Sequence, residues 1–359
     1  MTAMALSSLS VSWQFLFSGF LDIIRTVHKQ EKPMSKADIE FINMCRDILE
    51  NGTSTEGQKV RPHWPDGTPA YTIMKFGEIN RFDLREEFPM LTLRKTGIKS
   101  ATDEVLWIWQ KKSNNINDLG PHIWDEWADE TGSIGKAYGY QMAVKHSCKD
   151  VKDEGLVNAF PEYYEFAKND EGEDIFRDSE TGRVAAVKRN GKWHMDQVDK
   201  VIYDLKNTPF SRRIMTTIWN PEDLDEMNLQ PCAYSVTFVV SQEKGKEKLT
   251  LNMILNQRSQ DVLAAWAWNT CQYAVLQHMI AQVCDMEAGE FIHVDANAHI
   301  YAPRHIPAIE ELIQRTPQPA PEFWLDPEIH DFYRFTKDSV ALKNYQVAGE
   351  QIRNIEIAV

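Results

Sequence analysis

The sequence predicts an α+β fold, and three patterns support that prediction. Residues 34–52 place apolar side chains at helical spacing and stop at a glycine, as a helix does. Residues 64–91 alternate turn signals with short stretches typical of strands. Residues 233–259 have the pattern of two strand arms around the turn EKGKEK, and residues 275–283 then have the spacing of a buried helix.

Length, charge and cysteines restrict the class of protein. The chain has 359 residues, 43% of them hydrophobic, and a net charge of -14, so it can build a core but not a basic surface for nucleic acid. Any bound phosphate must be held by a local arginine cluster. The five cysteines form no C-x-x-C pair and no zinc-site spacing, which favours a protein of the reducing cytoplasm without a metal.

Two segments stand apart from the predicted core: an N-terminal extension and an internal insertion. The apolar run within residues 1–33 has no basic residue ahead of it, is too short to span a bilayer and contains Asp22, so we expect neither a signal peptide nor an anchor. A start at Met34 is an alternative. Residues 146–194 are polar and charged, and ETGR and RNGK are typical of hairpin turns. One domain with a surface insertion fits best.

Several arginines are candidates for binding a phosphate. Arg258 and Ser259 stand where a strand ends, and a guanidinium fork beside a hydroxyl suits phosphate oxygens. Arg61 lies in another block, and Arg212 and Arg213 form a pair ahead of an apolar strand. Paired arginines usually form a solvated face, which is the alternative.

Cys232 is the candidate nucleophile. It follows Pro231 and opens a strand, which fixes its backbone and can aim its sulfur into a cavity. Most lone cysteines are instead small buried hydrophobes. A nearby arginine would lower the pKa of the thiol and favour catalysis.

Other candidates have ordinary alternatives. Glu104 sits among apolar neighbours at helical spacing, where an inward carboxylate needs a partner or a catalytic task. Trp124 and Trp127 are close to Tyr138 in sequence, and they belong either to the core or to a lined pocket.

His299 and Tyr301 form a further pair of candidates. They alternate along a strand and therefore face one side. There they offer hydrogen bonds to a sugar hydroxyl, while a satisfied core histidine is the alternative.

Seven motifs occur together along the chain: IWDEWAD, KAYGYQ, SRRIMT, LQPC, QRSQD, Asn269 and HIY. In this order they resemble the thymidylate synthase and pyrimidine hydroxymethylase superfamily. The resemblance covers residues 34–359 and implies one catalytic α+β domain around a twisted mixed sheet. It also implies a homodimer in which the two sheets pack back to back.

The resemblance implies a nucleotide site shared between two subunits. Arg212 and Arg213 would reach the phosphate from the partner. The carboxamide of Asn269 both donates and accepts, which matches uracil, whereas cytosine-specific relatives carry aspartate there. The residues implied in binding dUMP are Arg61, Arg212, Arg213, Gln257, Ser259, Asn269, His299 and Tyr301.

The resemblance also implies a covalent mechanism. Cys232 would attack the 6-position of the pyrimidine as a thiolate, so that the 5-position attacks 5,10-methylenetetrahydrofolate. Arg258 would assist the thiolate, Glu104 would organise proton transfers, and Tyr138 would help to remove the 5-proton. The residues implied in folate binding are Ile123, Trp124, Trp127, Asp261, Ala265, Trp268 and Val359.

Departures from the synthase pattern determine the predicted product. The usual Leu-Gly-x-Pro-Phe-Asn is replaced at residues 264–269 by a stretch with Trp266 and Trp268, and the usual Gly-Asp before His-x-Tyr is Ala296 and Asn297. We interpret these changes as a rebuilt folate wall that lets water reach the transferred carbon in place of hydride. The prediction is a deoxyuridylate hydroxymethylase of the kind phages use, making 5-hydroxymethyl-dUMP.

Two alternatives stay open. The tryptophans are also consistent with neutral repacking, which would leave a thymidylate synthase making dTMP and dihydrofolate. Trp124, which is kept here, supports that alternative. The third hypothesis is an inactive nucleotide-binding relative, and the retained Cys232, Glu104, Tyr138 and Arg258 argue against it.

Overall fold

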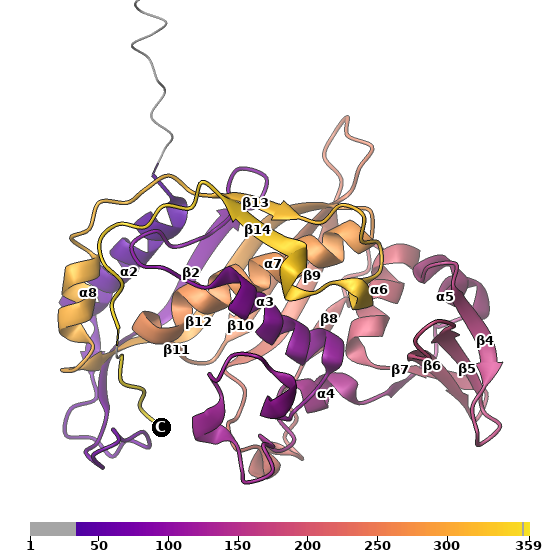
Figure 1. Ribbon diagram of the computed structural model, residues 1–359, viewed down its shortest axis with the longest axis horizontal. Coiled ribbons are helices and arrows are strands. Elements are labelled where there is room, and N and C mark those ends of the chain that lie inside the picture. The colour runs from indigo at the N-terminus through magenta and orange to yellow at the C-terminus, as the bar shows by residue number, and fades with distance from the viewer. Residues whose placement is uncertain (1–33, 354) are drawn as a thin grey trace, which may run out of the picture. The chain divides into compact units, whose positions relative to one another are not determined.

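The computed structural model describes residues 34–353 and 355–359 of the chain (Figure 1). The extension predicted at residues 1–33 lies outside the described residues. Within them, helices and strands combine around one large β-sheet. The predicted α+β class is confirmed.

The large sheet is mixed. β10 (Thr250–Gln257) runs parallel to β12 (Glu287–Ala302), and the short β11 (Gln260–Asp261) continues beside β12 in the same direction. The other neighbours are antiparallel, including β9 (Ala233–Ser241) on β10 and β2 (Tyr71–Asp83) on β12. The strand order is β1 (Thr53–Ser54), β2, β12, β10, β9 and β8 (Met215–Thr217).

β2 corrects one prediction from the sequence. Residues 64–91 contain one strand of 13 residues instead of several short ones, because the turn residues WPDGTP precede it and β12 pairs with it along its whole length. The hairpin of β9 and β10 is confirmed, and its second arm ends at Gln257, as expected.

Helices cover one face of this sheet (Figure 1). α7 (Ala267–Val283) packs on β10 and β12 and is buried along most of its length. α3 (Ile98–Leu106) packs on α7, and α2 (Lys36–Asn51) packs on β2. Two π-helical segments, Val262–Trp266 and Trp107–Lys111, lead into α7 and out of α3.

The core lies between the sheet and α7. Side chains alternate along a strand, so Phe238 of β9 and Leu255 of β10 both point to the helices and are buried. Val275 and Met279 meet them from one side of α7, as their helical spacing predicts. The remaining elements of this part are α4 (Gly139–Ala143), α6 (Gln197–Asn207), α8 (Ile306–Leu312), β13 (Glu322–Leu325) and β14 (Val340–Lys343). No helix among the described residues is long and apolar enough to cross a membrane.

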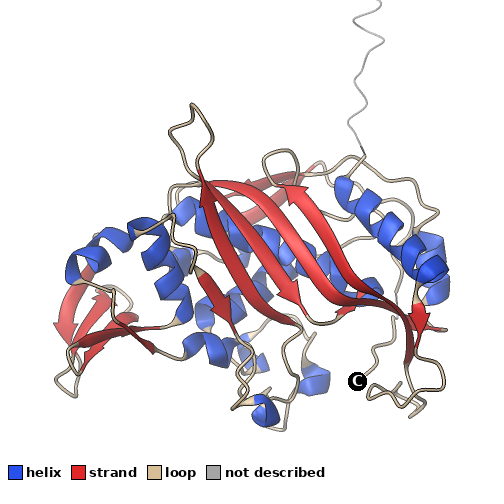
Figure 2. Cartoon of the chain, turned by 180° about the vertical axis from the view of Figure 1, so that it is seen from behind, coloured by secondary structure: helices blue, strands red, loops and turns tan. Residues whose placement is uncertain are grey.

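Among the described residues, no helix covers the opposite face of the large sheet (Figure 2). Val239 of β9 is 48% exposed and Ile79 of β2 is 61% exposed. Ile254 of β10 and Ile292 of β12 alternate with buried neighbours and are half-buried. Asn252 and the Arg81–Glu290 ion pair lie among these apolar side chains on the same face. An uncovered sheet face with exposed apolar side chains is typical of a protein contact surface.

Residues 146–195 form a second, antiparallel sheet with its own small core around Trp193. The two predicted turns are confirmed: Gly182 lies between β5 (Asp174–Asp178) and β6 (Val184–Arg189), and Asn190 and Gly191 lie between β6 and β7 (Lys192–Met195), all at positive φ. The description of this range as an insertion remains a prediction. Its elements are β3 (His146–Cys148), α5 (Asp153–Ala159), β4 (Tyr164–Lys168), β5 (Asp174–Asp178), β6 (Val184–Arg189) and β7 (Lys192–Met195).

A buried ionic cluster ties the second sheet to α6. Arg183, ahead of β6, donates to both carboxylate oxygens of Asp199 at 2.9 and 3.1 Å. The Tyr333 hydroxyl donates to the same carboxylate at 2.7 Å. Burial raises the pKa of Asp199, but the charges of Arg183 and Lys112 outweigh this effect and hold the pKa below its usual value.

Loss of Arg183 should destabilise the protein, because Asp199 would keep a buried charge without its main partner. For Arg183→Met we expect the free energy of unfolding, measured by urea titration, to fall by about 3 kcal/mol at neutral pH. Since the folded-state pKa of Asp199 is depressed, this difference is present above about pH 4 and shrinks as the carboxyl takes up a proton at lower pH. Arg177→Met is the control, because Arg177 pairs with Glu165 on the surface, and it should cost less than about 1 kcal/mol. Equal losses would contradict the role of the cluster.

Candidate active site

A cavity of about 790 Å³ opens where β10 ends and α7 begins, a volume typical of small-molecule sites. Arg212, Arg213 and Val359 are the sequence-derived candidates outside its lining. The candidates that line it are Arg61, Glu104, Ile123, Trp124, Trp127, Tyr138, Cys232, Gln257, Arg258, Ser259, Asp261, Ala265, Trp268, Asn269, His299 and Tyr301.

Arg258 holds the segment that carries Cys232. The backbone N–H of Arg258 donates to the Cys232 carbonyl at 3.0 Å. Its guanidinium donates to the carbonyls of Pro231 at 3.0 Å and Gln230 at 2.7 Å. Cys232 therefore lies directly before β9, and Arg258 holds its segment through three backbone carbonyls in a row.

The Cys232 thiol has a raised pKa. Burial raises it, and the charges of Arg258 and Arg61 and a hydrogen bond with Tyr138 offset this only in part. The nearby arginines lower the pKa of the thiol, as expected, but burial raises this pKa by more. In the free protein the thiol is therefore held in its protonated form.

Tyr138 reaches the thiol from a strained backbone position. It precedes α4 with φ of 45°, which is uncommon for a residue with a side chain. Gly139 follows and lets the chain pass close to Ser113, since an added Cβ would lie 2.0 Å from the Ser113 carbonyl oxygen. The Tyr138 hydroxyl accepts from the backbone N–H of Cys232 at 3.1 Å.

Glu104 is a buried carboxylate surrounded by nitrogen donors. It is 6% exposed on α3. Its Oε1 accepts from the Trp124 indole at 2.6 Å, and its Oε2 accepts from the Trp268 indole and the Gln272 amide, both at 2.5 Å. Burial raises the pKa of Glu104, and these hydrogen bonds offset the rise only in part.

The two tryptophans at the start of α7 point in different directions. Trp266 is fully buried beside Phe41 and Phe82 and donates to the Asn80 side chain at 2.9 Å. Trp268 lines the cavity and donates to Glu104. Helical residues two apart do not share a face. The prediction of a rebuilt folate wall is therefore wrong for Trp266, which belongs to the core.

Aromatic side chains line one wall of the cavity. Trp124 packs edge-on against Tyr138 with ring centres 4.8 Å apart, and Trp127 packs on Trp124 at 5.7 Å. Ile123 is 38% exposed beside them. Flat apolar walls of this kind suit a planar ligand.

Polar groups line the side of the cavity formed by β11 and β12. His299 and Tyr301 meet edge to face, with ring centres 5.0 Å apart. The Nδ1 of His299 lies 3.0 Å from the Asn297 side-chain oxygen, and burial lowers the pKa of this histidine, which favours the neutral ring. Asp261 lies 3.6 Å from His305. Burial raises the pKa of Asp261, but His305 and its other partners outweigh this and keep the carboxylate charged.

The two carboxamides near the end of β10 are held differently. Gln257 is 2% exposed, and its amide is committed to Gln260 at 2.6 Å and to His293 at 2.9 Å. Asn269 is half-buried and donates to the Gln272 side chain at 3.3 Å. Asn269 therefore keeps polar groups for a ligand, whereas Gln257 supports the surrounding structure.

The three candidates outside the lining have clear positions. Arg212 and Arg213 lie exposed in a turn ahead of β8. Val359 exchanges two backbone hydrogen bonds with His63, at 2.9 and 3.0 Å. This pairing brings preceding residues such as Ile357 to the cavity.

Gln272 and Arg94 line the cavity but were not identified from the sequence. Gln272 follows Trp268 by four residues, so helical spacing was a usable signal for it. Arg94 is 9% exposed and donates to the Ala264 carbonyl at 3.2 Å. Its loop has no pattern that points to a site.

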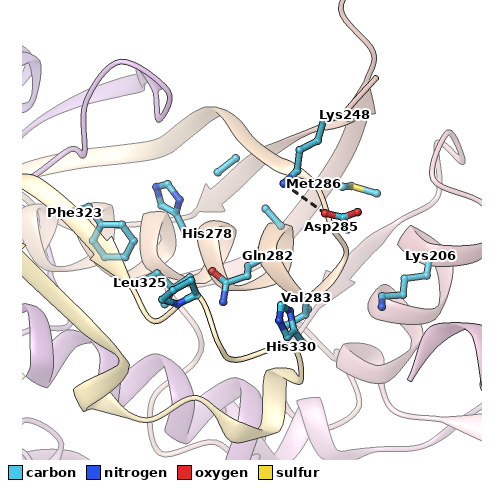
Figure 3. A pocket seen from close by; sticks show the side chains of 13 residues that line it. Lys206, Lys248, His278, Gln282, Val283, Asp285, Met286, Phe323, Leu325 and His330 are labelled. Carbon is cyan, nitrogen blue, oxygen red and sulfur yellow. Dashed lines mark ion pairs between the residues drawn. The ribbon is translucent and has the colours of Figure 1, made fainter. Parts of the chain in front are cut away.

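A second cavity of about 570 Å³ lies at the other end of α7 (Figure 3). His278, Gln282 and Phe323 contribute to its lining, and Lys248 and Asp285 pair beside it at 3.5 Å. None of the sequence-derived candidates lines it. In the part of the chain that the structure describes, no group of three or more His, Cys, Asp and Glu side chains is placed to bind a metal ion.

Known proteins that are similar to this chain share one name. The family described as "Thymidylate synthase" matches residues 39–359. The thymidylate synthases of Bacillus subtilis subsp. natto and Bacillus phage phi3T are each 38% identical over 330 residues, covering 91% of this chain and 100% of theirs. The solved structure of thermostable thymidylate synthase A from Bacillus subtilis is similar with a TM-score of 0.71 at 37% identity, covering 90% of this chain and 99% of that one.

These relatives contradict the predicted deoxyuridylate hydroxymethylase. They are named thymidylate synthases, so the prediction of 5-hydroxymethyl-dUMP as product is wrong. The physical reason lies in residues 264–269, whose side chains do not form one folate wall. Trp266 is in the core and Trp268 binds Glu104, so these two changes do not by themselves open a path for water.

The family match begins within α2 and reaches the last residue, so it includes the large sheet, the second sheet and every residue that lines the larger cavity. The relatives are matched over their full length at well above 30% identity. The chain therefore belongs to the thymidylate synthase family.

Proposed function

We propose that the protein is a thymidylate synthase, which transfers one carbon from 5,10-methylenetetrahydrofolate to the 5-position of dUMP and yields dTMP and dihydrofolate. The observation that supports this most is the meeting of Cys232, Arg258 and Glu104 in one cavity. The chain is also 38% identical to an enzyme of that name, over 91% of this chain and the whole length of that enzyme.

Cys232 supplies the nucleophile in this proposal. Its sulfur bonds to the 6-position of dUMP, and the electron pair of the ring double bond then makes the 5-position nucleophilic. Because burial keeps the thiol protonated in the free protein, the proton has to leave once substrate is bound, with Arg258 and Arg61 stabilising the thiolate. The 5-position then bonds to the methylene carbon of the folate, and Tyr138 helps to remove the 5-proton. The tetrahydrofolate that is released gives a hydride to this carbon, which becomes the methyl group as the sulfur leaves, so that the products are dTMP and dihydrofolate.

The nucleotide is held at the polar end of the cavity. Arg61, Arg258 and Ser259 offer two positive charges and a hydroxyl to the phosphate, in a chain of net charge -14. Asn269 reads the carbonyl and N–H edge of uracil. The remaining contacts, to the deoxyribose hydroxyl and around it, come from His299 and Tyr301, and Gln257 supports this end of the cavity through Gln260 and His293.

The folate occupies the aromatic wall. Trp124 and Trp127 provide a flat surface for its ring system. The charged Asp261 accepts hydrogen bonds from ring N–H groups. The other contacts are Ile123, Ala265 and Trp268, and Val359 acts indirectly by pairing with His63 and so holding Ile357 at the cavity. These side chains fit a planar, donor-bearing ligand, and the proposal involves no metal.

The active form is a homodimer that buries the bare face of the large sheet. Val239, Ile79 and Ile254 place apolar side chains on that face. Arg212 and Arg213 are exposed ahead of the edge strand β8, so they are free to complete the partner's phosphate site. The five cysteines are all unpaired, which fits the reducing cytoplasm.

Product analysis tests the proposed function directly. The purified protein is incubated with dUMP and 5,10-methylenetetrahydrofolate, the nucleotide is weighed by mass spectrometry, and the released folate is identified. We expect dTMP with dihydrofolate. A hydroxymethylated nucleotide with tetrahydrofolate, or no product, would reject the proposal.

Removal of the Cys232 thiol should abolish turnover but not binding. For Cys232→Ser we expect kcat to fall roughly 10³-fold or more, while calorimetry still detects dUMP binding. Cys148→Ser is the matched control, because its thiol only donates to the His146 carbonyl in β3, a bond that a hydroxyl replaces. Normal turnover by Cys232→Ser would show that the covalent mechanism is wrong.

The base preference should follow residue 269. Asn269→Asp replaces a donor and acceptor by an acceptor-only group, so the ratio of kcat/KM for dCMP over dUMP should rise roughly tenfold or more. Asn158→Asp on α5 adds the same charge away from the cavity and should leave the ratio unchanged. An unchanged ratio for Asn269→Asp would refute base reading by this residue.

The shared site can be tested by mixing two inactive variants. Cys232→Ser and the double variant Arg212→Ala, Arg213→Ala should each be inactive alone. After subunit exchange about a quarter of the wild-type activity should return, because half of the dimers are mixed and each holds one complete site. No recovery, with exchange verified by mass spectrometry, would mean that the two arginines do not act across the dimer.

A further inference from the structure

One oxygen of the Glu104 carboxylate is fully occupied. Oε2 accepts from both Trp268 and Gln272 at 2.5 Å, whereas Oε1 accepts only from Trp124. A carboxylate oxygen has two lone-pair positions. The donors on Oε2 fill both, so a free lone pair remains on Oε1 alone.

Gln272 has a fixed orientation. Its Nε2 donates to Glu104 and also lies 3.3 Å from the Ala101 carbonyl, so both N–H groups face acceptors. A flipped amide would place its oxygen against the carboxylate. The Gln272 oxygen must therefore face Asn269, whose amide nitrogen donates to it at 3.3 Å.

The orientation of Asn269 follows from that of Gln272. Because one N–H of Asn269 is used by Gln272, its other N–H and its carbonyl remain for a ligand in the cavity. Two hydrogen bonds thus connect the carboxylate of Glu104 to the amide proposed to read the base.

The groups that surround the Glu104 carboxylate are all uncharged. Among the described residues it forms no ion pair with a lysine, arginine or histidine, and its hydrogen-bond partners are uncharged. The titratable groups that face it are Tyr138 beside α4 and Cys271 and Tyr273 on α7. Burial raises the pKa of all three, so they stay neutral across the working pH range.

We propose that Trp268 and Gln272 are positioning residues that confine the proton of Glu104 to Oε1, and that Gln272 fixes the base-reading orientation of Asn269. This rests on the proposed function, which gives Glu104 and Asn269 their tasks. Trp268, one of the departures from the usual synthase pattern, then acts on proton transfer through Glu104 and is more than a folate contact.

The hydrogen-bond network can be tested in the free protein without any turnover. In the full chain labelled with ¹⁵N-tryptophan, the indole signal of Trp268 is assigned as the one lost in Trp268→Phe. It should shift with pH at one midpoint, the pKa of Glu104, and stop shifting in Glu104→Gln. In Gln272→Met the midpoint should rise by roughly one pH unit, because a donor to the charged form is lost. A pH-independent signal, or one that still titrates in Glu104→Gln, would overturn the proposal.

Kinetics test the consequence for the reaction. Trp268→Phe should lower kcat roughly tenfold with little change in the KM for dUMP, and should move the acid limb of the pH profile to higher pH. Trp266→Phe is the matched control, since it also removes a buried indole N–H, but one bonded to Asn80, and it should leave the pH profile in place. Gln272→Met should weaken the preference for dUMP over dCMP roughly tenfold.

These experiments distinguish a failure of the proposed function from a failure of the positioning role. If the wild-type protein makes no dTMP, the proposed function fails, and the indole titration still decides whether the network exists. If the wild type makes dTMP but Trp268→Phe keeps the wild-type pH profile, the positioning role is rejected while the proposed function stands.

Discussion

The parallel pairing of β10 with β12 is the constraint on which the candidate site depends. Strands that run in the same direction end at the same edge of a sheet, and α7 is the crossover that makes this possible. Arg258 therefore leaves the sheet near His299 and Tyr301. β9 runs antiparallel to β10, so its first residues, and Cys232 before them, arrive at that edge too. An antiparallel β10 and β12 would separate the thiol from the His299–Tyr301 pair.

The protein holds buried carboxylates in two different ways. Asp199 is paired with the cation of Arg183, and its pKa falls. Glu104 is surrounded only by neutral N–H donors, which offset the effect of burial only in part, so its pKa is raised. A full ion pair fixes a charge and suits a structural junction. Burial with neutral donors favours the protonated form of a carboxyl more than an ion pair does, which suits a group that has to move protons during a reaction.

Local patterns in the sequence predicted much of this structure, and non-local contacts account for what was missed. The hairpin and α7 follow from spacing within short segments, and the order of the motifs brought most of the site residues together in advance. The length of β2 depends on β12, more than 200 residues away. The direction of Trp266 depends on α2 and β2, which supply its contacts. The direction of Trp268 and the link from Gln272 to Glu104 depend on how α7 meets α3. The wrong prediction of the product has the same cause. The sequence shows that the motif has changed, but it does not show in which direction each of its side chains points.

The raised pKa of Cys232 bears on how long the free protein survives intact. Oxidants and alkylating reagents attack thiolates much faster than thiols. A sulfur that burial keeps protonated is thus a poor target for peroxide in the ligand-free protein. The same burial that makes deprotonation harder at the start of each turnover spares the nucleophile from chance damage between turnovers.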